Sequence, residues 1–274
     1  MSRRFAALAC VLLVATAGCG GVSSQNPQTT TAPTQTTATD APEQLAPGVT
    51  AGGVQDPEAL ADAHLAAVEN QTFVSHERIR RTNESGTGYW NATLSMLNES
   101  VWRYTSVQTG AFPSTYFGPR FDAYADGERM VYRIANETAR TYGVYQYTTE
   151  NETVVLPPDE VFERSYRQYY QRDFVYSLAS RTDEVAAVGD GAVRLTGIAN
   201  DLDLGSPEVT NVSFSMTVAA DGLVESIDLT YDHSTQPTTY RHTMTFAADV
   251  TDPVEEPDWY ETGLNETVLN ESDA

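Results

Sequence analysis

The chain has 274 residues, with 38 acidic and 16 basic side chains, and a formal net charge of −22. So acidic a protein excludes nucleic acid as a partner, because contacts to phosphate need a positive face. At ordinary salt the like charges oppose the compact state, whereas at molar salt the Debye length falls to about 3 Å and screens them. The composition therefore favours a protein adapted to high salt. A second interpretation, that the acids bind a cation or a basic partner, is less favoured because they are scattered along the chain.

The N-terminus contains the pattern of an export signal. Arg3 and Arg4 precede an apolar run that begins at Phe5, and small residues follow it. The run is shorter than the about 20 residues that a membrane-spanning helix needs. Its end, Thr16-Ala17-Gly18-Cys19, resembles a lipobox, although Thr16 stands where Leu or Val is usual. We expect a signal peptide over residues 1–18 and a lipid on Cys19. The alternative is an ordinary signal peptide with a chance Cys. Export by the twin-arginine route and export by the general secretory route both stay open.

Residues 19–54 are rich in Thr, Pro, Gln, Ala and Ser, with almost no large apolar side chains. Such a segment cannot bury enough surface to offset its ordering entropy, so we expect a disordered linker that holds the next domain off the membrane. The chain has two Cys. Cys10 leaves with the signal peptide and Cys19 is alkylated, so the mature chain offers no thiol for a disulfide or a metal.

A folded domain is predicted over residues 55–262. Asp56-Pro57 marks the start of a helix, with Asp as N-cap and Pro at the first helical position. His64 lies on the apolar side of this helix, where a packed His is favoured over a ligand. Segments rich in Val, Thr, Tyr and Trp then predict an antiparallel meander with one buried face. Its strands are expected at 72–82, 88–97, 100–108, 128–135 and 139–147.

A second helix is predicted from Pro157 to about Ala179. Apolar side chains repeat every four residues on one side, and charged pairs occupy the other. Packing on the sheet is favoured over a role in ligand contact. The aromatic members of this stripe are Phe162, Tyr166, Tyr170 and Phe174.

The last third shows the clearest alternation. Apolar residues alternate with polar ones from Asn211 to Val218, and Asp221-Gly222 predicts a hairpin turn before the return strand. The next strand, over 240–246, directs His242 to the apolar face, where a satisfied core His is the favoured interpretation. A short helical turn around Trp259 is expected to close the domain, followed by an acidic tail over 263–274.

Four stretches in this third carry a resemblance to known proteins: Arg194-Leu195-Thr196-Gly197, Asn211-Val212-Ser213, Asp221-Gly222-Leu223-Val224 and Pro257-Asp258-Trp259-Tyr260. They resemble an uncharacterised family of haloarchaeal lipoproteins. The order of the elements also resembles the LolA/LppX/RseB-type lipoprotein fold. This second resemblance implies an α+β domain with a strongly curved, open antiparallel β-sheet, a half-barrel whose concave face helices cover. It further implies that this face holds a lipid or another apolar ligand, with Phe162, Tyr166, Tyr170 and Phe174 at the mouth of the pocket.

Motifs for chemistry are missing from the sequence. It contains no His-Glu-x-x-His, no Gly-x-Ser-x-Gly and no phosphate-binding loop, and its four His lack the spacing of metal ligands. No pair of carboxylates stands out as acid and base. We therefore expect no catalytic residue, no metal and no cofactor.

One motif is dense, namely the N-glycosylation acceptor Asn-x-Ser/Thr. In an exported protein it marks exposed turns and strand edges, although a bias toward Asn-Glu-Thr turns without sugar is the alternative. The nine Asn at such sites are Asn70, Asn83, Asn91, Asn98, Asn136, Asn151, Asn211, Asn265 and Asn270.

Together these patterns predict a non-enzymatic glycoprotein, anchored by lipid at the extracellular face of the cell membrane, that binds a lipid or other apolar ligand in the concave sheet. A surface scaffold or sensor that binds another envelope protein is the first alternative. An unrecognised hydrolase is a remote one.

Overall fold

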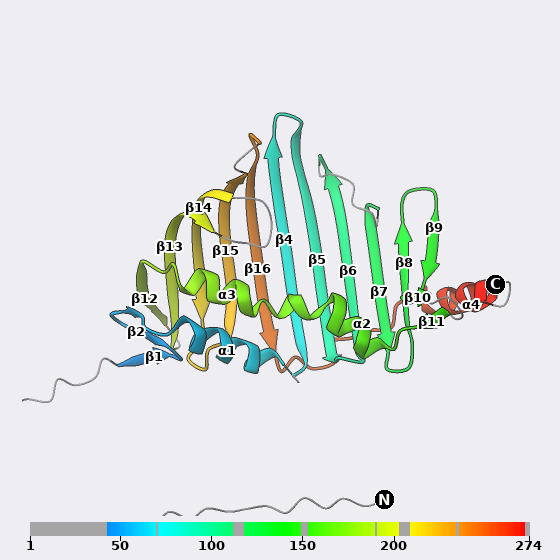
Figure 1. Ribbon diagram of the computed structural model, residues 1–274, viewed down its shortest axis with the longest axis horizontal. Helices are drawn as coiled ribbons and strands as arrows, with labels where there is room; N and C mark the ends of the chain where they lie inside the picture. The colour runs from blue at the N-terminus through cyan, green and yellow to red at the C-terminus, as the bar shows by residue number, and fades with distance from the viewer. Residues whose placement is uncertain are drawn as a thin grey trace, which may run out of the picture. The chain divides into compact units, whose positions relative to one another are not determined.

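One antiparallel sheet of 11 strands organises the domain (Figure 1). The computed structural model describes residues 43–69, 71–111, 118–148, 153–189, 191–202, 209–233 and 236–271. The predicted signal peptide, Cys19 and most of the predicted linker fall outside the described residues, as do Asn70 and Asn151.

The sheet joins the two meanders of the sequence, because β16 pairs with β4 from Thr239↔Thr82 to Ala248↔Phe73. Its end strands, β12 and β9, do not pair with each other, so the sheet is open. The predicted fold class, an α+β half-barrel with an open antiparallel sheet, is thereby confirmed. The spatial order is β12 (Glu184–Gly189), β13 (Ala192–Leu202), β14 (Val209–Val218), β15 (Val224–His233), β16 (Thr239–Ala248), β4 (Phe73–Asn83), β5 (Gly86–Asn98), β6 (Val101–Gly110), β7 (Arg120–Asp126), β8 (Met130–Ala135) and β9 (Arg140–Gly143).

Two of these strands were not predicted, and burial explains both. In β7 every residue from Phe121 to Ala125 is buried, because elements cover both of its faces. Alternation is then lost from its sequence. In β12 the opposite holds, since five of its six residues are exposed at the edge of the sheet and give no apolar signal.

Helix α1 (Pro57–Val68), α2 (Pro158–Ser165), a 3-10 turn η1 (Arg167–Tyr170) and α3 (Arg172–Ala179) cross one face of the sheet (Figure 1). We call this concave, helix-covered side the inner face. The N-cap of α1 is as predicted, with the side chain of Asp56 accepting from the backbone N–H of Ala59 at 3.0 Å. The buried aromatic and aliphatic side chains between these helices and the sheet form the main core.

The predicted single helix over 157–179 is wrong, because the chain breaks it at Gln171. This residue has the left-handed φ of 60°, and its N–H bonds to the carbonyl of Gln168, which closes the 3-10 turn. The break lets α3 turn to pack beside α1, while α2 stays over Trp102 of β6. A straight helix could not follow both neighbours across a twisted sheet.

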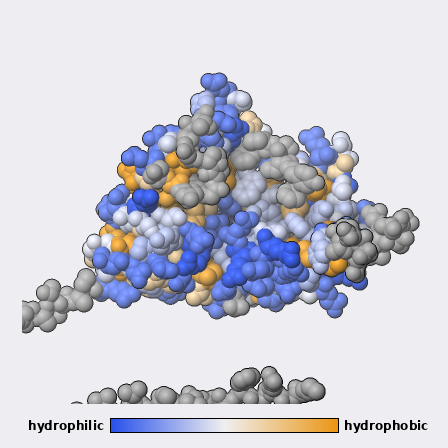
Figure 2. Space-filling model, in the orientation of Figure 1, coloured by the Kyte–Doolittle hydropathy of each residue, from blue (hydrophilic) through white to orange (hydrophobic). Residues whose placement is uncertain are grey.

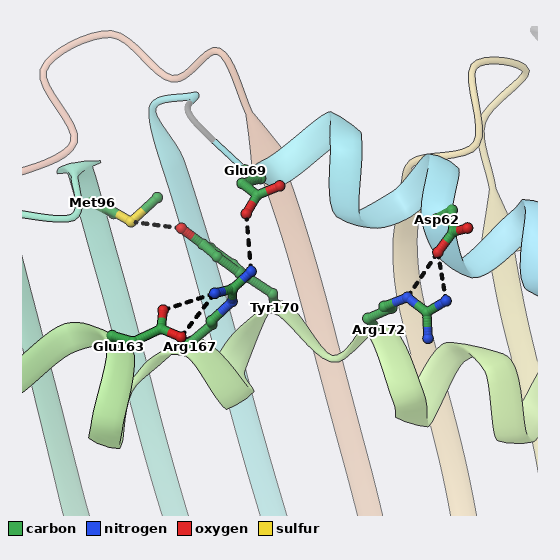
Figure 3. Close-up of polar contacts among 7 residues, drawn as sticks. All are labelled: Asp62, Glu69, Met96, Glu163, Arg167, Tyr170 and Arg172. Atoms are coloured by element: carbon green, nitrogen blue, oxygen red, sulfur yellow. Dashed lines mark hydrogen bonds and ion pairs between the residues drawn. The ribbon is translucent and has the colours of Figure 1, made fainter. Parts of the chain in front are cut away.

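Ion pairs flank this break and tie it to α1, as Figure 3 shows. Before it, Arg167 donates to Glu69 at 3.2 Å and to Glu163 of α2. After it, the Nε of Arg172 donates to Asp62 at 2.7 Å. The position of Gln171 on the sheet is therefore fixed from both sides.

A fourth helix, α4 (Tyr260–Glu271), lies where a short turn and an acidic tail were predicted. It packs on the outer face of β7 to β9, opposite the other helices, through a second core of Tyr124, Val131, Trp259 and Tyr260. Gly263 permits the close approach, since a Cβ there would lie 2.9 Å from the Cγ1 of Val131. Apolar residues on the outer face of β7 and β8 supply the contact that local sequence near the C-terminus does not reveal.

The same outer face holds one buried charge cluster. Asp122 of β7 has no exposed surface and accepts hydrogen bonds from Arg133 and, at 3.2 Å, from Arg120. The guanidinium of Arg133 lies 5.1 Å from the ring of Trp259. The pair and the cation–π contact join β7, β8 and the segment that leads into α4.

Two small sheets complete the described chain. The first, β1 (Gln44–Ala46), β2 (Val49–Thr50) and β3 (Gly53–Val54), lies within the predicted linker, and its Ala46 and Val49 are buried in the main core. The folded domain therefore begins before residue 55, within the segment that was predicted to be a disordered linker. The second sheet pairs β10 (Gln146–Thr148) with β11 (Thr153–Val155).

Candidate functional site

A cavity of about 380 Å³ lies on the inner face, between α3 and strands β4, β15 and β16. Its volume falls in the range of about 300–1,000 Å³ that is usual for ligand pockets. Aromatic and aliphatic side chains make up most of the lining, and a few polar groups complete it. The lining residues are Glu77, Ile79, Gln171, Phe174, Val209, Tyr231, His233, Tyr240, His242 and Met244.

Strand alternation and the helix break place this lining. Every second residue of β16 faces inward, so Tyr240, His242 and Met244 follow one another along the floor. On α3 the break brings Gln171 and Phe174 over them. Figure 2, seen from this side, shows apolar surface near the upper part of β14 and β15, whereas hydrophilic side chains cover the outside of α2 and η1.

One polar pair stands in the lining. The Nε2 of His242 lies 2.6 Å from the Oε1 of Glu77, and the two side chains are only 10% and 12% exposed. They are diagonal neighbours across β16 and β4, because Glu77 pairs with Met244. The carboxylate can only accept, so Nε2 carries the hydrogen. The ring of Phe174 lies 6.0 Å from the imidazole.

Two tyrosines form the β15 and β16 wall. Tyr231 and Tyr240 are directly opposite in the ladder, and their rings stack at 5.1 Å with an angle of 10°. Burial raises the pKa of Tyr231 to about 12, and the neighbouring Tyr240 and Glu77 add to this shift. Its hydroxyl therefore stays neutral and offers a hydrogen bond beside an apolar surface.

The chemical groups of this lining define what it can bind. Among the described residues, the lining contains no Ser, Cys or Lys that a neighbouring base could activate. Among the residues that the structure describes, no three His, Cys, Asp or Glu side chains are grouped so that they could hold a metal ion. Apolar walls with one polar pair can enclose an apolar chain and contact a polar end.

The structure separates the four predicted ligand-contacting aromatics. Phe174 lines the cavity. Phe162, Tyr166 and Tyr170 are buried in the main core instead. Tyr166, for example, packs 4.5 Å from the ring of Trp102. The break at Gln171 is the reason, because it divides the stripe that a continuous helix would have presented to one place.

Glu77, Tyr231 and Tyr240 were not predicted to be site residues. The signal for Glu77 was present in the alternation of β4, where Phe73, Ser75, Glu77 and Ile79 face inward. It could not be used, since the pairing of β4 with β16 joins residues more than 150 positions apart.

A wider and more open hollow of about 620 Å³ lies on the outer face of β13 to β16. Ser and Thr hydroxyls line most of it, together with Arg194 and the ion pair of Arg241 with Asp228.

Six of the nine predicted glycosylation sites have described side chains. Asn83 and Asn98 end β4 and β5, where the turns to the next strands begin, and Asn136 lies in the turn between β8 and β9. Asn91 and Asn211 are strand residues, and Asn265 lies on α4. Asn270 is also in α4, but its side chain, like Asn70 and Asn151, lies outside what the structure describes.

The sequence matches no protein-family model and no curated protein. Among solved structures, the chain is similar to LprF from Mycobacterium bovis, with a TM-score of 0.34 and 10% identity over 73% of this chain and 96% of that one. A DUF1329 family protein from Desulfovibrio piger gives a TM-score of 0.29 and 10% identity over 74% and 95%. The MucA/MucB complex of Pseudomonas aeruginosa gives 0.28 and 11% over 72% and 59%. Scores and identities this low carry no ligand, partner or residue role over to this chain.

Proposed function

We propose that this domain is a non-enzymatic module that binds a lipid or another apolar molecule in the inner-face cavity. The observation that carries the proposal is the cavity itself, about 380 Å³ with Phe174, Ile79, Val209 and Met244 in its lining. Covering apolar surface gains about 25 cal/mol for each Å² removed from water, so an apolar chain is the favoured occupant.

Displacement of an uncharged fluorescent naphthylamine probe, together with native mass spectrometry of the purified domain, tests this. Phe174→Ala removes one wall of the cavity and should weaken probe binding by about tenfold, which corresponds to about 1.4 kcal/mol. Tyr176→Ala is the matched control, because Tyr176 is on the same helix, is 45% exposed and does not line the cavity. No probe binding, or equal losses in the two variants, would contradict the proposal.

We further propose that a lipid on Cys19 anchors the protein at the extracellular face of the cell membrane. Supporting this are the basic start, the short apolar run and the small residues before Cys19. Within the described ranges, no helix combines the length and the apolarity that crossing a membrane requires. Two chains on one Cys would meet the need for two signals in stable anchoring.

The wild-type protein should partition into detergent and lose its domain when intact cells are treated with protease. Cys19→Ser should release the protein from the membrane fraction and change the mass of the mature chain. A variant that still partitions into detergent at unchanged mass would contradict the anchor, and protection from protease in intact cells would contradict the location.

A further inference from the structure

The cavity lining holds one carboxylate and two imidazoles, those of His233 and His242, and His242 is bonded to that carboxylate. Glu77 is the one carboxylate in the described lining, and neither Arg nor Lys is part of it. Its Oε1 is bonded to His242, and the described residues give its Oε2 no hydrogen bond. A carboxylate offers about four acceptor positions, so Glu77 can still accept from a ligand.

The nearest cation on the inner face of β4 points away from this place. Arg81 lies opposite Gly88 of β5, and its Nη1 donates to the carbonyl of Ala111 at 3.3 Å, just beyond the end of β6. Its guanidinium therefore extends over β5, away from β15 and β16. Arg78, Arg80 and Arg241 alternate to the outer face. Glu77 thus meets a ligand without a competing Arg.

Such a cavity discriminates between head groups. Like charges repel at short range in a partly buried site, so a ligand carboxylate beside Glu77 is repelled. A cation is attracted, and the rings of Phe174, Tyr231 and Tyr240 in the same lining are surfaces on which cationic ammonium groups are held. Building on the proposed function, we propose that the cavity selects an amphiphile with a cationic amine head group over one with a carboxylate.

Three amphiphiles that share a dodecyl chain test this by competition with the uncharged probe, below their micelle concentrations. They are dodecyltrimethylammonium, dodecanol and dodecanoate. Measurement at molar salt, where the Debye length is about 3 Å, removes the general attraction of an acidic protein for cations. We expect the ammonium compound to bind at least about tenfold more tightly than the carboxylate, with the alcohol between them.

Glu77→Gln keeps a hydrogen-bond acceptor for His242 and should reduce this difference to about twofold, with unchanged affinity for dodecanol as the sign that the cavity is intact. Glu84→Gln, which removes an exposed acid in the turn after β4, should leave the wild-type preference unchanged. If wild-type protein binds dodecanoate as tightly as the ammonium compound, the head-group proposal is overturned while the apolar cavity stands. If none of the three displaces the probe, both proposals fall.

A second, independent observation concerns the glycosylation motif. In the three turn sites the Asn side chain folds back, and its Oδ1 accepts the N–H of the residue two positions later at 2.9 Å. The amide Nδ2, which would carry the sugar, has no hydrogen bond to the described residues. These sites are Asn83, Asn98 and Asn136.

In the other three described sites, one of the two required groups is bonded to a residue outside the motif, whereas the hydroxyl of Thr138 in the site of Asn136 donates to the Oδ1 of Asn136 itself at 3.2 Å. The Nδ2 of Asn211 donates to Asp232 at 2.9 Å. The hydroxyl of Thr93, in the site of Asn91, is hydrogen-bonded to the Nδ1 of His76 at 3.0 Å. The hydroxyl of Thr267, in the site of Asn265, is buried and donates to the carbonyl of Gly263.

Because the motif needs both an amide and a hydroxyl two residues later, an acceptor must present both. We infer that modification of the folded protein goes to Asn83, Asn98 and Asn136 and not to the other three. Glycopeptide mass spectrometry of the protein from its own membranes should find sugar on the first set alone. Replacing that set by Gln should remove the added mass, and replacing the second set should not. Sugar on Asn91, Asn211 or Asn265, or none at the turns, would overturn the inference.

Discussion

The buried imidazole of His64 should make stability depend on pH. This side chain has no exposed surface and joins three elements. Its Nε2–H donates to the carbonyl of Tyr170 at 2.9 Å, and its Nδ1 accepts from the backbone N–H of Val224 at 3.2 Å. A proton on Nδ1 would break the second bond. Burial lowers the pKa of His64 from 6.5 to about 4, although the carbonyl of Tyr170 raises it in part.

The direction of the change in stability with pH depends on whether the folded or the unfolded chain binds the proton more readily. Between about pH 6.5 and about pH 4 the unfolded chain protonates this His and the folded chain does not, so the free energy of unfolding falls as the pH falls. At 1.36 kcal/mol for each unit of pKa difference, the loss between about pH 8 and about pH 5 is about 2 kcal/mol. Above about pH 6.5 the contribution is complete.

Urea unfolding at molar salt, followed by tryptophan fluorescence across this range, measures the effect. His64→Gln cannot titrate, so its free energy of unfolding should fall about 2 kcal/mol less than that of the wild type between about pH 8 and about pH 5. The variant should start about 1–3 kcal/mol lower, because a buried hydrogen-bonding group loses a partner. Other acidic groups contribute equally to both curves. Parallel curves for the two proteins would refute the reasoning.

Three further predictions concern packing and charge. Asp122→Ala leaves a buried Arg unpaired and should lower the free energy of unfolding in urea by about 3 kcal/mol, whereas Arg120→Ala, at a half-exposed partner, should cost less than about 1 kcal/mol; equal losses would contradict this. Gly263→Val forces α4 away from β8 and should cost about 1–3 kcal/mol, seen as a lower Tm, and an unchanged Tm would count against that packing. Burial raises the pKa of Tyr104 to about 12 and also raises that of Tyr169, so stability should fall above about pH 10, where the unfolded chain ionises first. Phenolate absorbance should then rise together with unfolding, and a gradual rise in the folded protein would show the reasoning to be mistaken.

Local sequence was sufficient to predict an element wherever one of its faces is buried and the other is exposed to solvent. The alternation along β14 predicted its inward residues, and Asp221-Gly222 predicted the turn, where Gly222 has the positive φ of 99°. Asp56-Pro57 predicted the start of α1. His64 and His242 are buried, as their places on apolar faces indicated. In each case the pattern that indicates burial or a turn lies within a few residues along the chain.

Contacts between segments that are distant in the sequence decided the strand pairing, the helix break and the lining of the cavity. No pattern in β4 or β16 names the other as its neighbour, so the meeting of Glu77 with His242 could not be predicted. β7 was missed because burial on both faces removes alternation. The break at Gln171 is imposed by neighbours on two sides, which moved Phe174 alone into the cavity. Sequence fixes which side of an element is apolar, but the partner that covers it, and therefore the site, depends on pairing across the whole sheet.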